Sequence, residues 1–144
     1  MSSADHLDDD CIFCKIIRVE IPSFKVFEDG KTFAFMDINP IASGHSLVIP
    51  KFHSANLYET PDEWVAVTAT AIRRLAWAVE KTLEPAGVSI VQANGPGAKQ
   101  SVHHLHMHVI PRGIDDDLMM SWELVPGDTD AIGELVERIK ANLD

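Results

Sequence analysis

Short stretches in which apolar and polar residues alternate predict β-strands along most of the chain. Successive side chains of a strand point to opposite faces, so a period of two indicates a strand with one buried face. Residues 24–28 and 32–37 flank Asp29-Gly30, a dipeptide typical of tight turns, and together they predict a hairpin. Further strands are expected over residues 45–49, 88–92 and 102–110.

Two other segments carry apolar residues at the three- and four-residue spacing of a helix. The longer one starts with Thr60 as N-cap and Pro61 in its first turn, and Glu63 would complete a capping box. The second starts at Asp128 or Thr129 and has the apolar stripe Ile132, Leu135, Val136, Ile139 and Leu143. With a helical turn near residues 11–18 as well, the pattern favours an α+β fold with a mainly antiparallel sheet.

Composition and charge narrow the class of protein. With 144 residues, 46% of them apolar and 24% charged, the chain can bury the core of one soluble domain. We expect a single domain over residues 11–144 after an acidic, disordered tail over residues 1–10. The net charge of −10 argues against a nucleic-acid partner, although not against a small anionic substrate. No apolar run is long enough for a membrane partner and no secretory signal is visible, so a cytoplasmic location is expected.

Histidine occupies every second position of the last predicted strand, at His104, His106 and His108. In a strand these side chains would share one face, about 6.6 Å apart. Three imidazoles fill a core poorly, but they suit the binding of a metal or a phosphate, or nucleophilic attack. The segment therefore predicts a functional site.

The two cysteines, Cys11 and Cys14, are separated by two residues. In a reducing compartment this spacing indicates metal binding or redox activity rather than a structural disulfide. A tetrahedral zinc site would need two more ligands.

Residues 100–110 resemble the signature of the histidine triad (HIT) family of nucleotide hydrolases and transferases. The similarity covers roughly residues 11–122 and includes further motifs at residues 11–16, 35–40 and 44–51. The resemblance implies a HIT-like fold with a five-stranded antiparallel sheet, to which the periodicity adds one long helix and a C-terminal helix outside the matched range. It also implies a homodimer whose sheet continues across the interface, and a purine nucleotide as the bound part of the substrate.

The resemblance places the nucleophile at the middle histidine, His106. A neutral ring nitrogen would attack the α-phosphorus and form a nucleotidyl–histidine intermediate, which water then hydrolyses. The other ring nitrogen must donate its proton to a fixed acceptor. His108 would donate to a phosphate oxygen, and Gln100 and Ser101 would contact the phosphate and the leaving group. Either of these last two could instead serve only in a turn.

The same resemblance implies the nucleotide-binding residues. Asp37 would accept the ribose hydroxyls, and His45 would support the phosphate hydrogen bonds. Asn94 would lie near the ribose and phosphate, although an Asn before Gly can also be a turn residue. The apolar candidates for the base pocket, each of which could instead be core, are Ile12, Phe13, Ile16, Phe35, Ile38 and Val102.

Members of the family with this cysteine pair resemble galactose-1-phosphate uridylyltransferase in holding a structural Zn²⁺ with two histidines. The matching positions are His53 and His104 beside Cys11 and Cys14. Such a closed Cys₂His₂ set would be structural and would not act as a Lewis acid. Two reduced thiols without a metal are the alternative.

One position departs from the family pattern, because Lys99 stands where a glycine usually precedes the glutamine. A lysine there gives up the close backbone approach that glycine permits. It could contact a substrate phosphate or lie in water.

The layout favours the Hint-like branch of the family, in which AMP is cleaved from a phosphoramidate or an acyl-adenylate. Three alternatives stay open. The first is a Fhit-like hydrolase of dinucleoside polyphosphates, and the second is a nucleotide-binding sensor with negligible turnover. The third is a metalloenzyme in which all three triad histidines bind one zinc ion.

Overall fold

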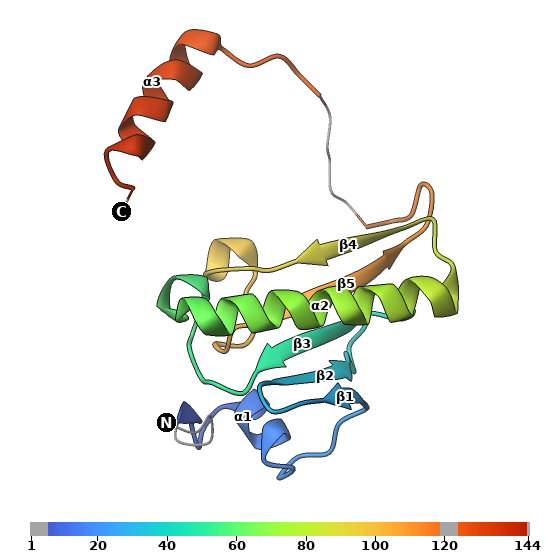
Figure 1. Ribbon diagram of the computed structural model, residues 1–144. Coiled ribbons are helices and arrows are strands. Elements are labelled where there is room, and N and C mark those ends of the chain that lie inside the picture. The colour runs from blue at the N-terminus through green and yellow to red at the C-terminus, as the bar shows by residue number, and fades with distance from the viewer. Residues whose placement is uncertain (1–5, 119–123, 144) are drawn as a thin grey trace.

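A computed structural model describes residues 6–118 and 124–143 and contains one five-stranded sheet (Figure 1). The strands are β1 (Lys25–Glu28), β2 (Thr32–Met36), β3 (Ser46–Pro50), β4 (Gly87–Val91) and β5 (Met107–Arg112). Their order across the sheet is β1-β2-β3-β5-β4, and every neighbouring pair is antiparallel. The α+β class and the five-stranded antiparallel sheet are confirmed.

Helices bury both faces of this sheet. Alternation along β2 places Ala34 against α2 (Asp62–Leu83), while Phe33 and Phe35 lie on the opposite face beside α1 (Ile12–Ile17). The core on the α2 side consists of Ala34, Val48, Ala71, Ile72, Leu75, Val79 and Val109. The core on the α1 side consists of Phe13, Ile16, Phe33, Phe35, Leu47 and Ile49. His108 lies opposite Leu47 in the register of β3 and β5, so the histidines are on the α1 side.

The long helix begins differently from the prediction. Its N-cap is Pro61, which makes no side-chain capping bond, and the helix starts at Asp62. Thr60 instead follows the 3₁₀ turn η2 (Leu57–Glu59), and its hydroxyl donates to the carbonyl of Asn56 at 2.6 Å. The predicted capping box with Glu63 is therefore wrong: the Thr60 hydroxyl donates to the Asn56 carbonyl and pairs with the Ser54 hydroxyl, and the helix starts without a side-chain cap.

The histidine strand is shorter than the predicted 102–110. β5 begins only at Met107, so His104 and His106 precede it. The amide of Leu105 donates to the carbonyl of Ser54, and the side chain of Gln100 donates to the carbonyl of Val102. The first bond ties the segment to the loop after β3, and the second holds its start, which follows the turn η3 (Pro96–Ala98), so these residues do not join a strand ladder.

The two ends of the described chain behave in opposite ways. The ring of His6 packs against Phe52, and its carbonyl accepts from the amide of His53, so the described part of the acidic segment contacts the loop after β3. Residues 1–5 lie outside the described part. At the other end, α3 (Thr129–Lys140) begins as predicted, with the Asp128 side chain accepting from two backbone amides. It lies away from the sheet, and none of its side chains is buried (Figure 1).

Among the described residues, no helix combines the length and apolar character needed to cross a bilayer.

Candidate functional site

A cavity of about 210 Å³ opens on the α1 side of the sheet. Most of the residues expected to bind a nucleotide or its phosphate line it: Ile12, Phe13, Ile16, Phe35, Asp37, Ile38, Ser101, Val102, His106 and His108. α1 closes one wall, the end of β2 another, and the histidine segment forms the floor. Segments that are up to 96 positions apart in sequence, from Ile12 to His108, thus meet in one apolar pocket that contains a few polar groups, as ligand sites commonly do.

The ring of His106 is held by its backbone and by an aromatic neighbour. Its Nδ1 lies 2.7 Å from the carbonyl oxygen of His104, and a carbonyl only accepts, so Nδ1 carries the proton. The ring packs edge-on against Phe13, with centroids 5.1 Å apart. Burial lowers the pKa of His106, which favours the neutral ring. The Nε2 lone pair is therefore the nucleophilic position of this residue.

A chain of hydrogen bonds fixes the proton of His108. The amide of Ile41 donates to Nδ1 of His45 at 3.2 Å, so the proton of the neutral His45 ring is on Nε2. This Nε2 lies 2.8 Å from Nδ1 of His108 and donates to it. His108 must then carry its own proton on Nε2, which makes it a donor toward the cavity that it lines.

Burial, with neighbouring His106 and His45 adding repulsion to any positive charge, lowers the pKa of His108 to about 4. Burial also lowers the pKa of His45, and the carboxylate of Asp37, 3.5 Å from its Nε2, opposes this shift. Asp37, His45 and His108 are close enough to share a cation. The hydrogen bond between the two rings already accounts for their closeness, however.

Two residues expected at the phosphate instead brace the surrounding loops. Gln100 accepts from the amide of Gly95 and donates to the carbonyls of Ala55 and Val102. Asn94 accepts from the amide of Leu57 and pairs with the side chain of Gln92. Neither lines the cavity, so the structure favours the turn role that sequence reasoning left open for both.

The cavity also has lining residues that sequence reasoning missed, namely Ile21, Pro22, Ser23, Met36, Asn39 and Leu47. The amide of Asn39 donates to a carboxylate oxygen of Asp37 at 2.8 Å and so orients that carboxylate. An Asp two residues before an Asn-Pro turn is the one sequence signal that could have indicated this contact.

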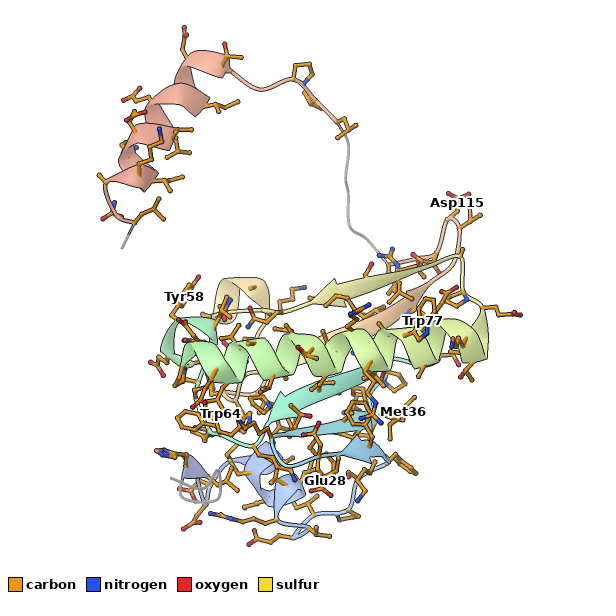
Figure 2. The ribbon with its side chains drawn as sticks, viewed as in Figure 1. Glu28, Met36, Tyr58, Trp64, Trp77 and Asp115 are labelled. Carbon is orange, nitrogen blue, oxygen red and sulfur yellow. The ribbon has the colours of Figure 1, made fainter. Side chains whose placement is uncertain are left out.

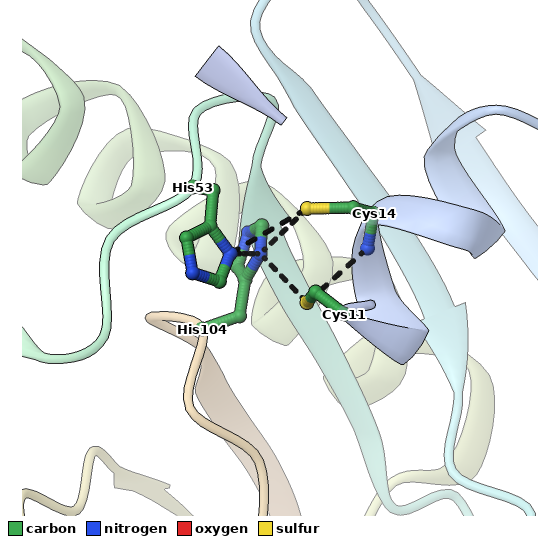
Figure 3. Close-up of side chains that lie close together, drawn as sticks. All are labelled: Cys11, Cys14, His53 and His104. Carbon is green, nitrogen blue, oxygen red and sulfur yellow. Dashed lines mark hydrogen bonds between the residues drawn. The ribbon is translucent and has the colours of Figure 1, made fainter. Parts of the chain in front are cut away.

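A second cluster lies beside the first, where α1 meets the loop after β3 and the histidine segment (Figure 3). It consists of the four predicted metal ligands, Cys11, Cys14, His53 and His104, whose ligand atoms all lie within 4.8 Å of one another. Sγ of Cys14 is 3.5 Å from Nδ1 of each histidine, and the two Nδ1 atoms are 3.3 Å apart. A tetrahedral Zn²⁺ with ordinary bond lengths would place S and N about 3.6 Å apart and N and N about 3.3 Å apart.

The protonation of this cluster also fits a cation. Nε2 of His104 donates to the carbonyl of Pro50 at 2.9 Å, so its Nδ1 turns a lone pair toward the cluster. The Nε2 side of His53 lies 3.7 Å from the carboxylate of Asp8, which favours a proton there. The hydrogen bond from Cys14 lowers the pKa of Cys11, which favours a thiolate at this position. Converging lone pairs and a ready thiolate are what a Cys₂His₂ zinc site requires.

The three triad histidines do not converge on one point. His104 belongs to the cysteine cluster, whereas His106 and His108 line the cavity. Within the described residues, the groups able to hold a metal do not include His106. This separation argues against a single zinc ion bound by all three.

Lys99 adopts a left-handed backbone conformation, with φ 61° and ψ 38°. Glycine enters this region without the steric cost that a side chain adds. The family's usual glycine at this position is thereby explained, and Lys99 keeps the same turn at some cost in strain. Its side chain is exposed and does not line the cavity.

Comparisons with known proteins agree with this geometry. Residues 18–114 match the family model described as the HIT domain. The chain is 41% identical over 145 residues to adenosine 5'-monophosphoramidase HNT1 of Saccharomyces cerevisiae, covering 100% of this chain and 89% of that protein. A crystal structure from Streptococcus mutans superposes with a TM-score of 0.90 at 35% identity, covering 96% of this chain and 88% of the other. A zinc-bound histidine triad family protein from Mycobacterium smegmatis superposes with a TM-score of 0.72 at 38% identity, covering 94% of this chain and 96% of the other.

Proposed function

The chain belongs to the HIT domain family, and on that premise we propose that it is a hydrolase that releases AMP from phosphoramidate or acyl conjugates of the nucleotide. The similarity to a named adenosine 5'-monophosphoramidase along the whole chain supports the substrate class. The observation that carries the proposal is the ring of His106. Its proton is fixed on Nδ1, which leaves the Nε2 lone pair free, and His106 lines the largely apolar cavity.

In the proposed reaction, Nε2 of His106 attacks the α-phosphorus. A P–N bond to Nε2 forms and the bond to the leaving group breaks, with the leaving amine taking up a proton from Ser101, which lines the cavity. The Nε2–H of His108 donates to a non-bridging phosphate oxygen as negative charge builds there. Water then attacks the phosphorus and gives a proton back to the Ser101 oxygen, the bond to Nε2 breaks, and AMP leaves with His106 neutral and the Ser101 hydroxyl restored.

The nucleotide itself would lie between α1 and the end of β2. Apolar side chains of Ile12, Phe13 and Ile38 offer the faces that a purine ring packs against. The carboxylate of Asp37, oriented by the Asn39 amide, has a second oxygen for the ribose hydroxyls. His45 would act through His108 rather than touch the substrate.

The cysteine cluster fits Zn²⁺, and we propose that it holds this ion as a structural centre. Cys11, Cys14, His53 and His104 would be its four ligands, and Asp8 would orient His53. A closed set of four protein ligands leaves no coordination position for substrate. When bound, the ion would join the N-terminal segment to the loop that carries His106 and so hold the cavity wall formed by α1.

We also propose that two copies pair along β4. This strand is an edge of the sheet, and an unpaired edge needs another strand or a cover. Trp77 projects from the neighbouring face of α2 and is 62% exposed (Figure 2). Together with Ile72, Ala76, Val88 and Ile90 it lines a shallow apolar groove between α2 and β4. An apolar surface that continues from an open strand edge is suited to a symmetric interface.

AMP release measured side by side from an adenosine phosphoramidate and from a dinucleoside polyphosphate tests the substrate class. We expect release from the phosphoramidate, its loss in His106→Ala, and its retention in the matched control His103→Ala, since His103 is exposed and lies outside the cavity. Release from the polyphosphate alone would move the chain to the Fhit-like alternative. AMP binding without release from either substrate would favour the sensor.

A further inference from the structure

Lys99 carries a long side chain at a position whose backbone favours glycine. Its φ of 61° lies in the left-handed region, where a Cβ crowds the following carbonyl oxygen. Two hydrogen bonds hold the turn in this form, because the amide of Lys99 donates to the carbonyl of Pro96 and the amide of Gln100 donates to the carbonyl of Gly95. The lysine therefore strains a turn in which glycine would lie without strain.

Nothing in the described fold makes use of this side chain. Lys99 is exposed, and within residues 6–118 and 124–143 its ammonium takes part in no ion pair and lies over no aromatic ring. Lys51, by contrast, pairs with Glu28 at 2.7 Å. Local violations that the fold does not repay are typical of functional positions. We therefore looked for the role of Lys99 in the substrate rather than in the protein.

The turn places Lys99 beside the part of the cavity where the leaving group would lie. Ser101, the proposed proton donor to that group, lines the cavity and is itself exposed, so the cavity meets solvent at this residue. Two Cα–Cα steps of 3.80 Å keep the Cα atoms of Lys99 and Ser101 within about 7.6 Å. The four-carbon stem of a lysine reaches across most of such a distance. The side chain of Gln100 holds the segment in place through the carbonyls of Ala55 and Val102.

The cavity itself offers no positive charge. Of the described residues that line it, none is a lysine or an arginine, and Asp37 is acidic. Burial lowers the pKa of both His106 and His108, so both rings are neutral near pH 7. The whole chain carries a net charge of −10. A substrate with a further negative charge beyond its α-phosphate would therefore need a cation close to that charge.

We propose that Lys99 determines specificity for the leaving group, by pairing its ammonium with a carboxylate that the leaving amine carries. The preferred substrate class is then AMP joined through nitrogen to an amino acid, rather than to a neutral amine. The ammonium is a compact charge with three donors, so it suits a single carboxylate at the surface. The inference rests on the function proposed above, because it takes Ser101 to mark the side of the leaving group.

Two conjugates that differ in one charge test this role, namely AMP joined through nitrogen to alanine and to alaninamide. The selectivity is kcat/KM for AMP release from the alanine conjugate divided by that from the alaninamide conjugate. The intrinsic reactivity of the two amines cancels, because the same pair is compared across variants. Lys99→Met keeps the size of the side chain and the left-handed turn but removes the charge. It should lower the selectivity about two- to fivefold, the value of an exposed ion pair. Lys99→Glu should lower it further through repulsion.

The matched control is Lys31→Met, which removes the same charge from an exposed lysine in the turn between β1 and β2, outside the cavity. Its selectivity should stay within about 1.5-fold of the native value. Two more readouts separate charge from any change in the turn. Lys99→Arg should keep the native selectivity, and raising NaCl from about 50 mM to about 500 mM should lower the selectivity of the native chain but not that of Lys99→Met.

Each outcome decides between the proposals. Native selectivity in Lys99→Met, or an equal loss in Lys31→Met, would overturn the role of Lys99 and leave the proposed function in place. Equal losses of kcat/KM for both conjugates in Lys99→Met would also overturn it, since the residue would then act only through the turn. Release of AMP from neither conjugate by the native chain would overturn the proposed function and this inference together.

Discussion

His104 and His106 are two residues apart, yet they belong to sites of opposite construction. Around His104, four ligand atoms from three segments lie within 4.8 Å of one another, and none of the four residues lines the cavity. Around His106, Nδ1 is hydrogen-bonded to the carbonyl of His104, and Nε2 is free in a residue that lines the open pocket. One site is closed and suited to a structural ion, whereas the other is open and suited to chemistry.

The difference depends on which nitrogen the backbone engages. The carbonyl of Pro50 holds Nε2 of His104, so Nδ1 is the free lone pair, and the carbonyl of His104 holds Nδ1 of His106, so Nε2 is free. The two histidines thus present lone pairs from different ring nitrogens, Nδ1 in His104 and Nε2 in His106. A histidine is assigned to a metal or to a substrate by its backbone hydrogen bond as much as by its place in the sequence.

The largest expected effect is the loss of AMP release when His106, in the open site, is replaced. His106→Asn should lower AMP release by at least about 10⁴-fold, because the variant lacks the attacking nitrogen. The midpoint of thermal unfolding should shift by only a few degrees, since no metal ligand is lost. Single-turnover rates and thermal melts measure the two effects. A variant with a tenth of the native rate would exclude His106 as nucleophile.

Metal removal from the closed site should have the opposite result, with a large loss of stability and a small loss of activity. A structural ion at a thousand times its dissociation constant stabilises the fold by about 4 kcal/mol. A chelator, or Cys14→Ser, should therefore lower the melting midpoint by about 10–15 °C. In protein that stays folded at low temperature, AMP release should fall far less than in the His106 variant. Complete loss of activity without loss of stability would instead indicate a catalytic metal.

Lowering the pH should destabilise the open site through its neutral histidines. In the folded chain the pKa of His108 is about 4, whereas in the unfolded chain it returns to about 6.5. Between these values the unfolded state binds more protons, so stability falls as the pH falls, by at most about 1.4 kcal/mol per pH unit for one such residue. Urea titrations at pH 7.5 and pH 5 should show a smaller difference for His108→Gln than for the control His103→Gln. An equal loss of unfolding free energy between pH 7.5 and pH 5 in both variants would contradict this assignment.

Replacing His45, which donates to Nδ1 of His108, tests whether this hydrogen bond fixes the proton of His108. His45→Phe should lower the rate of AMP release by about 10–100-fold, because nothing then fixes the proton of His108 on Nε2. The conservative variant His45→Gln, whose amide can still donate, should recover part of the rate. The binding of AMP should change less than the rate in both. Equal losses in both variants would point to packing rather than proton placement.

The smallest effect concerns the turn that leads into both sites. Lys99→Gly should stabilise the chain by about 0.5–1 kcal/mol, because glycine adopts the left-handed conformation of this position without strain. Chemical denaturation measures the change. A destabilised variant would show that the lysine side chain makes a contact worth more than the strain.

Much of the fold was predictable because local rules decide it. The Asp29-Gly30 turn and the alternation on either side specify the hairpin, and Asp128 specifies the start of α3. The start of α2 was not predictable, because the turn η2 comes just before it and takes Thr60 as its own C-cap, with the Thr60 amide donating to the carbonyl of Leu57. The exposure of the α3 stripe could not be predicted either, since a periodic pattern states that a face is apolar and not what covers it.

The site shows the same division. The grouping of Cys11, Cys14, His53 and His104 follows from the family resemblance, and the structure brings the four together. Strand periodicity alone would have put His104 and His106 on one face with one purpose. Their separation comes from hydrogen bonds to loops, which no periodicity encodes. Gln100 and Asn94 were expected near the phosphate, Asn94 through the resemblance, with a turn role open for both, because polar residues beside a glycine-rich loop serve both binding and turns.

The central claim is that Nε2 of His106 carries the nucleotidyl group during turnover. Rapid acid-free quenching of the native chain with an adenosine phosphoramidate, followed by proteolysis and fragment mass spectrometry, locates that group on a single residue. We expect the mass of one AMP moiety on His106 and none on His104 or His108. An adduct on His108, or steady AMP release with no adduct on any histidine, would contradict it.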